Sequence, residues 1–221
     1  MIVLAIDTAT NSCAACLYDT EGKRVLAEQT DDIGRGHAEH LLGLIDQVLE
    51  AASLTFDEID KVAVSIGPGS FTGIRVGVAT ARSLGLALNK PVVGISTLEA
   101  LAAEFASDTP FAVTVQAGRG QAYVQTFNTN DIVHSQPYIV KLDDTPSSQI
   151  EPLYSKLIGN AAELVDEARA TTFLGSATSS IKHIALLGAQ SDAPPNPLYI
   201  RSADAKIAAG FALPRKAELA K

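Results

Sequence analysis

The order of apolar and polar residues in the first half of the chain predicts an α/β fold. Residues 2–7 and 61–67 are almost continuously apolar, as expected of strands covered on both faces, and residues 91–95 form a further short apolar run. Residues 13–18 alternate like a strand and lead into a turn at residues 21–22, after which a third strand is expected. Helical repeats separate these blocks, so we expect a sheet with helices packed against it.

Two long helices are predicted where apolar residues recur every three or four positions. Residues 38–52 carry a stripe typical of a helix packed on a sheet, formed by Leu41, Leu44, Ile45, Val48, Leu49 and Ala52. Residues 71–88 contain only two charged residues, Arg75 and Arg82, whose i, i+7 spacing places both on one narrow strip. A third helix is expected from residue 97, because Ser96 and Glu99 have the spacing of a capping box.

The helix at residues 71–88 has little polar surface. One face can pack on the sheet, and a second face is made of small or apolar residues: Gly73, Val76, Gly77, Ala79, Thr80, Ser83 and Leu84. Either another segment of the same chain covers this second face, or the two long helices together bind a second protein. Exposed apolar patches usually mark interfaces. The positive mean hydropathy of +0.17, despite a net charge of −8, favours the second interpretation slightly.

A second lobe is expected after Ser107. Residues 111–116 and 123–127 predict a pair of strands, and helices are expected at residues 161–168 and 179–187. A proline-rich stretch at residues 193–197 then ends regular structure. We therefore expect an N-terminal lobe of residues 1–107 and a C-terminal lobe of residues 108–221.

The composition is that of a folded protein with a sizeable core. Of 221 residues, 47% are apolar and 19% are charged, and 17 basic against 25 acidic residues give a formal net charge of −8. Such a charge repels a polyanion, so we expect no strong direct binding to nucleic acid. No run reaches the roughly 18 apolar residues of a membrane helix. The chain enters a strand at once, so we expect a cytoplasmic protein with no membrane contact.

The two cysteines are expected to be packing residues. Cys13 and Cys16 are an odd number of positions apart in a predicted strand, so their side chains should point to opposite faces of the sheet. Neither a disulfide nor a metal pair follows from that arrangement.

Two turns carry residues suited to a nucleotide. Asp7, Thr8 and Thr10 follow the first strand, where a carboxylate and hydroxyls can hold a hydrated magnesium ion and a phosphate. Gly69 and Ser70 belong to a glycine-rich loop at residues 67–75, whose amides at the helix start could bind an anion. The loop lacks the lysine of a Walker A motif. One hypothesis is therefore an enzyme that uses Mg-ATP at these two loops, and the alternative is that the glycines only permit a sharp turn.

His37 and His40 lie three residues apart at the start of the first long helix. Two imidazoles without a third ligand do not make a metal site, so we expect a capping or interface role and no metal in this chain. A peptidase would need a metal or a nucleophile that the sequence does not offer.

Five segments, in order along most of the chain, resemble the TsaB (YeaZ) family. They are residues 6–9 (IDTA), 35–42 (RGHAEHLL), 67–77 (GPGSFTGIRVG), 94–101 (GISTLEAL) and 197–201 (PLYIR). The glycine-rich segment is the most specific of them, and residues 128–190 contribute little.

The resemblance implies an actin-like, Hsp70-like (ASKHA) fold with two ribonuclease H-like lobes, the second of them shortened. It also implies a non-catalytic scaffold in the formation of threonylcarbamoyladenosine on tRNA. In that family a TsaD-like catalytic subunit pairs with the first two helices, and a TsaE-like ATPase docks on the pair. ATP and magnesium then belong to the partner complex, this chain alone needs no cofactor, and without its partner the same surface can form a homodimer.

The partner surface implied by the resemblance lies on the two long helices. Its residues are His37, His40, Leu41, Leu44, Ile45, Gly73, Val76, Gly77, Thr80 and Ser83. We expect Val76→Glu or Leu44→Glu to abolish pairing while the isolated chain stays folded.

Two departures from the catalytic relatives predict a pseudo-enzyme. The catalytic relative carries a His-x-x-x-His metal pair where this chain has Thr97 and Leu101, which cannot ligate a metal as imidazole does. In the second lobe, Gln116 and Gly118 replace the first and third residues of the Asp-Ala-Arg-Arg that TsaB sequences usually show. We therefore expect no ATP turnover.

Overall fold

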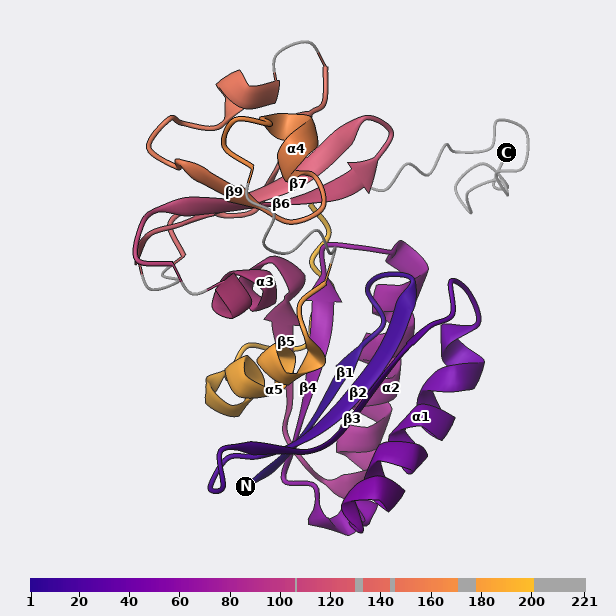
Figure 1. Cartoon of the computed structure of the whole chain (residues 1–221). Helices are drawn as coiled ribbons and strands as arrows, with labels where there is room; N and C mark the ends of the chain where they lie inside the picture. The colour runs from indigo at the N-terminus through magenta and orange to yellow at the C-terminus, as the bar shows by residue number, and fades with distance from the viewer. Residues whose placement is uncertain (106, 130–132, 144–145, 171–177, 201–221) are drawn as a thin grey trace, which may run out of the picture.

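Two β-sheets form separate lobes, one above the other in Figure 1. The computed structural model describes residues 1–105, 107–129, 133–143, 146–170 and 178–200. The first sheet has five strands in the order β3-β2-β1-β4-β5, and the second has four in the order β8-β7-β6-β9. The predicted two-lobed α/β arrangement is therefore present.

The first sheet mixes antiparallel and parallel pairing. Its strands are β1 (Ile2–Asp7), β2 (Ser12–Asp19), β3 (Arg24–Asp32), β4 (Lys61–Gly67) and β5 (Val92–Ser96). Short turns join β1, β2 and β3 into antiparallel neighbours, whereas β4 and β5 run parallel to β1 because helices connect them. Strand β1 is buried almost throughout, which explains its continuous apolar sequence.

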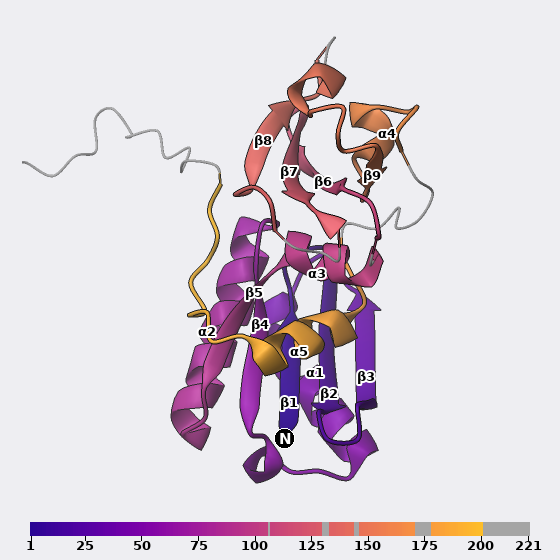
Figure 2. The same ribbon diagram turned by 90° about the vertical axis from the view of Figure 1, so that its left-hand side faces the viewer.

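Helices cover both faces of this sheet (Figures 1 and 2). Helices α1 (His37–Ala52) and α2 (Phe71–Leu88) cover one face, and α5 (Ile181–Gln190) covers the other. A short 3-10 helix, η1 (Phe56–Glu58), follows α1. Among the described residues, no helix is long and apolar enough to cross a membrane.

The cysteines confirm the predicted strand geometry. Cys13 packs with the residues under α1 and α2, and Cys16 packs with the residues under α5, so the two side chains lie on opposite faces of the sheet. Burial raises the pKa of the Cys13 thiol to about 11 and that of Cys16 to about 12. Both thiols therefore stay protonated at neutral pH, as expected of packing residues.

The second lobe is small and rests on α3 (Thr97–Phe105). Its elements are β6 (Phe111–Gly118), β7 (Gln121–Phe127), β8 (Tyr138–Lys141), the 3-10 helix η3 (Pro146–Gln149), β9 (Lys156–Ile158) and α4 (Ala162–Val165). Leu98 and Leu101 of α3 pack against Phe111 and Phe127, so one apolar layer joins the two lobes.

The C-terminal part of the described chain returns to the first lobe, which differs from the expected second lobe of residues 108–221. Ile181 and Ile184 of α5 pack on Val3 and Ala5 of β1. The periodicity of α5 showed an amphipathic helix, but it carried no information about which sheet the helix would cover. The expected helix at residues 161–168 is also shorter, since α4 ends at Val165.

The start of α3 differs from the expected capping box. The hydroxyl of Ser96 accepts a hydrogen bond from the amide of Leu98 at 3.3 Å. Glu99 turns instead toward the second lobe, where its side chain bonds to Gln125 of β7, and burial raises the pKa of its carboxyl group. Glu99 thus links the lobes rather than capping the helix.

An extended segment, here called the strap (residues 191–200), runs from α5 past β5 to α2 (Figure 2). The buried Lys61 ammonium donates to the carbonyl of Ser191 at 2.6 Å. Backbone hydrogen bonds then join the strap to Gly94 and to Ile66. On α2, Arg82 Nη2 donates to the carbonyl of Pro195 at 2.8 Å. Part of the polar strip of α2 is therefore covered by the same chain.

Candidate functional site

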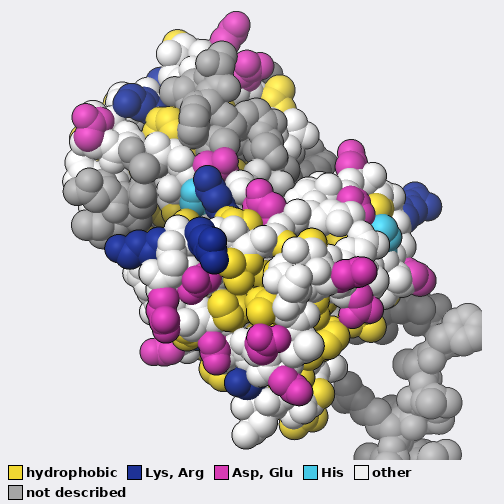
Figure 3. Space-filling view, turned by 60° about the horizontal axis from the view of Figure 1, so that its bottom comes forward, with side chains coloured by type: hydrophobic (Ala, Val, Ile, Leu, Met, Phe, Trp, Pro, Cys, Tyr) yellow, Lys and Arg dark blue, Asp and Glu magenta, His cyan; other side chains and the backbone are white. Residues whose placement is uncertain are grey.

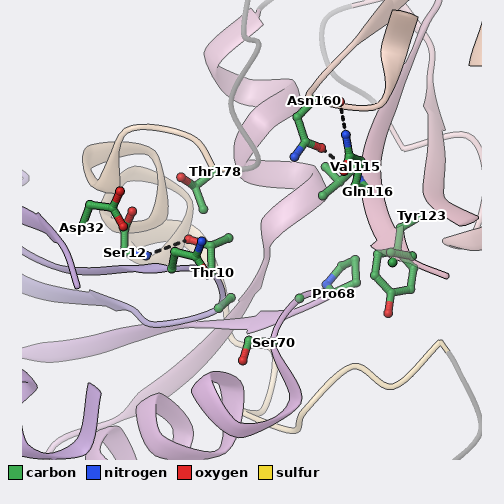
Figure 4. A pocket seen from close by; sticks show the side chains of 15 residues that line it. Thr10, Ser12, Asp32, Pro68, Ser70, Val115, Gln116, Tyr123, Asn160 and Thr178 are labelled. Carbon is green, nitrogen blue, oxygen red and sulfur yellow. Dashed lines mark hydrogen bonds between the residues drawn. The ribbon is translucent and has the colours of Figure 1, made fainter. Parts of the chain in front are cut away.

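A cavity of about 510 Å³ opens between the two lobes (Figure 4). Thr10, Ser12 and Asp32 of the first lobe stand on one side, and Gln116 and Asn160 of the second lobe stand on the other. The volume lies in the usual range for small-molecule sites, about 300–1,000 Å³.

Neutral polar groups dominate the lining of this interlobe cavity. Thr10 Oγ1 accepts from the amide of Ser12 at 3.3 Å, and the amide of Gln116 donates to Asn160 Oδ1 at 2.8 Å. Among the lining residues that the structure describes, Asp32 is the one carboxylate and none is lysine or arginine. A triphosphate in this cavity would therefore meet hydroxyls, amides and a carboxylate, without a cationic side chain to balance its charge.

Asp7 and Thr8 lie beneath the cavity and are engaged within the chain. The carboxylate of Asp7 accepts hydrogen bonds from the Ser65 hydroxyl and, at 2.8 Å, from the amide of Ala9. Burial raises the pKa of Asp7, although the bond from Ser65 works in the opposite direction. Thr8 is fully buried, and its hydroxyl donates to the carbonyl of Gly73 at 2.7 Å. Of the five residues predicted to contact a nucleotide, Thr10, Gly69 and Ser70 line the cavity.

The glycine-rich loop is shaped by contact with the turn after β1. The amide of Ser70 donates to the carbonyl of Ala9 at 2.6 Å, and its hydroxyl caps α2 by accepting from the amide of Gly73 at 3.2 Å. A side chain at Gly69 would collide with the carbonyl of Ala9. Close backbone packing therefore accounts for this glycine.

A second cavity, here called the α1–α2 groove, lies where the two long helices begin. It has a volume of about 550 Å³. Its lining consists of Gly34, Arg35 and Gly36 before α1, His37, Ala38 and Glu39 at the start of α1, Ser70 before α2, and Thr72, Gly73 and Val76 of α2. The structure thus brings together His37, Gly73 and Val76, which the sequence placed in one partner surface.

Five of the predicted partner residues are buried within the chain. Leu41, Leu44 and Ile45 are 0% exposed and pack in the core between α1 and the first sheet. Gly73 and Gly77 face Thr8, and a side chain at either position would collide with it. These residues cannot offer side chains to a partner, so the expectation that Leu44→Glu leaves the chain folded is wrong.

The other five predicted partner residues reach the surface. Val76 and Thr80 are half-buried, and Ser83 is exposed. His37 Nε2 lies 3.0 Å from the carbonyl of Thr10, and His40 Nε2 lies 2.6 Å from Asp31 Oδ2.

The two histidines join the start of α1 to the first sheet, His37 at the turn between β1 and β2 and His40 at the edge strand β3. The hydrogen bond from His40 lowers the pKa of Asp31. Within the described part of the chain, no three histidine, cysteine, aspartate or glutamate side chains come close enough to hold a metal ion.

Three exposed apolar residues on these helices were absent from the predicted partner set. Leu42 is 51% exposed, Phe71 is 47% exposed and Leu86 is 86% exposed. Leu42 lies off the core stripe of α1, which is a signal that the helical periodicity already contains. The contact of Phe71 with Tyr199 of the strap, at 5.2 Å between ring centroids, has no signal in the sequence because 128 positions separate the two.

The surface charge agrees with the composition. Figure 3 shows aspartate and glutamate side chains spread over the first lobe around a central group of hydrophobic side chains, with few lysines and arginines. This face therefore offers a polyanion such as RNA little electrostatic attraction.

Comparison with known proteins gives the family. Residues 24–213 match the family model of TsaD, tRNA N6-adenosine threonylcarbamoyltransferase. The tRNA threonylcarbamoyladenosine biosynthesis protein TsaB of Buchnera aphidicola (Schizaphis graminum) is 38% identical over 125 residues, which are 55% of this chain and 58% of that protein. TsaB of Escherichia coli is 34% identical over 102 residues, which are 46% of this chain and 43% of that protein. The chain thus matches about half the length of these relatives.

The fold is that of a solved relative. YeaZ from Pseudomonas aeruginosa superposes with a TM-score of 0.72 at 21% identity, covering 90% of this chain and 99% of that one. The expected two-lobed fold is confirmed. The chain belongs to the TsaD family and, within it, to the TsaB (YeaZ) proteins.

Proposed function

We propose that this chain acts in the biosynthesis of threonylcarbamoyladenosine on tRNA, as a non-catalytic subunit that pairs with a TsaD-like catalytic subunit. Its TsaB relatives carry the name of that pathway. The observation that carries the proposal is the surface around the α1–α2 groove. Both helices already pack on the sheet with their inner surfaces, yet Val76 and the exposed Leu42 leave apolar area on their outer surfaces. Such a surface is stabilised by a partner that removes it from water.

The groups that would support catalysis in this chain are used for structure. Asp7 and Thr8 are bound to neighbouring segments beneath the cavity. Thr97, at the position that resembles a metal ligand in the catalytic relative, is buried and donates to the carbonyl of Pro68 at 2.8 Å. The chain then supplies a folded surface, and the catalytic groups, ATP and magnesium belong to the partner complex.

A TsaE-like ATPase docks on the pair in this proposal, and a homodimer through the α1–α2 groove replaces the pair when the catalytic subunit is missing. The homodimer follows from one exposed surface that can close on either a related subunit or a second copy.

Light scattering after gel filtration tests the pairing. We expect this chain and the TsaD-like subunit from the same cell to form a one-to-one complex that replaces any homodimer. Leu42→Glu and Val76→Glu should abolish the complex, because each places a charge in the apolar surface. Leu153→Glu is the matched control, since Leu153 is also exposed, at 60%, but lies in the second lobe. Two separate species with the unmodified chain would contradict the proposal.

Calorimetry with Mg-ATP separates this function from a nucleotide-dependent enzyme. We expect no low-micromolar binding by the isolated chain, because none of the described residues that line the interlobe cavity is a lysine or arginine. Tight binding that Ser70→Ala or Thr10→Ala weakens would favour the enzyme hypothesis instead.

A further inference from the structure

An arginine on the exposed side of α2 packs beside two aromatic rings that also contact each other. The guanidinium carbon of Arg75 lies 3.7 Å from the centroid of the Phe71 ring and 5.8 Å from that of the Tyr199 ring. Arg75 Nε donates to the hydroxyl of Tyr199 at 3.0 Å. The side chain is thereby held by the face of the Phe71 ring and by the hydroxyl of Tyr199, although it lies at the surface.

The terminal nitrogens of Arg75 have no hydrogen-bond partner among the described residues. Its one hydrogen bond to another described residue uses Nε, and no described carboxylate pairs with it. Arg82 on the same helix differs, because its Nη2 already donates to Pro195 and, at 2.8 Å, to Asn196 Oδ1. Arg82 fastens the strap, whereas Arg75 presents the outer edge of a guanidinium that matches a carboxylate in two parallel hydrogen bonds.

The cluster of Phe71, Arg75 and Tyr199 borders the α1–α2 groove. Thr72 and Val76, which line the groove, are the next residues in the chain after Phe71 and Arg75. Phe71 and Tyr199 are 47% and 46% exposed, which is unusual for two large aromatic side chains in contact. Arginine and tyrosine are the residue types that most often dominate the energy of protein interfaces.

We propose that Arg75, held by Phe71 and Tyr199, binds a carboxylate side chain of the TsaD-like subunit and anchors one end of the interface. This inference rests on the proposed pairing. It adds the strap to the surface that contacts the TsaD-like subunit. The strap supplies Tyr199, so the pairing depends on a segment more than 100 residues away from α2 in sequence.

A protein carboxylate fits this cluster better than an RNA phosphate. Nucleic acid is held by several cations at once, whereas Arg75 is one cation on a chain with a net charge of −8. The flanking rings also offer apolar area that a protein side chain can cover.

Affinity measurements with the purified TsaD-like subunit test the inference. Arg75→Gln and Tyr199→Ala should each raise Kd by about tenfold or more, the range of interface anchors. Arg75→Lys should also raise Kd, because an ammonium group lacks the planar surface that lies over the Phe71 ring and does not form the double hydrogen bond. Arg75→Gln should also reduce the dependence of Kd on salt. Lys182→Gln is the control for a lost positive charge, since Lys182 is exposed on α5 across the sheet.

The other possible results of these measurements also decide between the inference and its alternatives. If the unmodified chain pairs and both variants pair equally well, the inference is wrong and the proposed function stands. If the unmodified chain does not pair, both are wrong. If Arg75→Gln leaves the subunit affinity unchanged but weakens retention of tRNA by the assembled complex, the ligand is a phosphate and the carboxylate proposal is overturned. Tyr199 lies on the extended strap, outside the apolar cores, so Tyr199→Ala keeps the test valid if a helix substitution disturbs folding.

Discussion

Small residues occur both on the surface of α2 that faces the sheet and on its outer surface, for different reasons. On the inner surface, Gly73 and Gly77 leave no room for a side chain, because α2 lies directly against Thr8 in the turn after β1. On the outer surface, Ser83 is exposed to solvent and Thr80 is half-buried. Small residues can therefore reflect a close contact within the chain or an open surface, and the sequence pattern alone does not separate the two.

Helix α1 also has a buried inner surface and an exposed outer surface. Leu44 is fully buried under the sheet, whereas Leu42, two positions earlier, is half exposed. Substitutions on the inner surfaces should therefore affect folding, and substitutions on the outer surfaces should affect association.

The largest expected effect comes from the same substitution at these two leucines. Leu44→Glu should lower the free energy of unfolding by more than about 4 kcal/mol, because it buries an unpaired carboxylate in the core. Leu42→Glu should change it by less than about 1 kcal/mol, as surface substitutions usually do. Urea denaturation followed by circular dichroism measures both. Equal losses would show that the outer surface of α1 is packed within the chain.

A smaller effect is expected from valine at two positions of α2. Gly77→Val should cost about 3 kcal/mol, because the new side chain meets the Thr8 hydroxyl and Val64. Ala79→Val, at an exposed position two residues later, should cost only about 0.5 kcal/mol through helix propensity. Thermal unfolding of the two variants against the unmodified chain gives the comparison. A tolerated valine at position 77 would mean that α2 does not approach the turn after β1 this closely.

The smallest effect is a dependence on pH at the buried Asp7, which precedes Thr8 in the chain. Burial raises the pKa of Asp7, so the folded state binds its proton more tightly than the unfolded state. The stabilisation that this tighter proton binding gives the folded state is complete below the ordinary aspartate pKa of 3.8. It is lost as the pH rises through the pKa of Asp7 in the folded state. Asp7→Asn resembles the protonated form, so its advantage in the free energy of unfolding should grow as the pH rises above 4. Denaturation at several pH values tests this, and an advantage that shrinks with rising pH would contradict it.

Local features of the chain were predictable from sequence because neighbouring residues produce them. The continuous apolar run of β1, the core stripe of α1 and the opposed directions of Cys13 and Cys16 all follow from strand and helix periods. The failed predictions involve distant segments. Glu99 pairs with Gln125 instead of capping α3, and α5 returns to the first sheet.

The sequence by itself determined the fold class, the order of the elements in the first lobe and the resemblance to a family, because hydrophobic periods and motif spacing are written along the chain. Only the tertiary structure decided which surface of α1 and α2 is free, that Asp7 and Thr8 are engaged beneath the cavity, and that Tyr199 meets Arg75. The physical reason is that burial and pairing depend on which segments the folded chain brings together, and residues far apart in sequence carry no periodic signal of their contact.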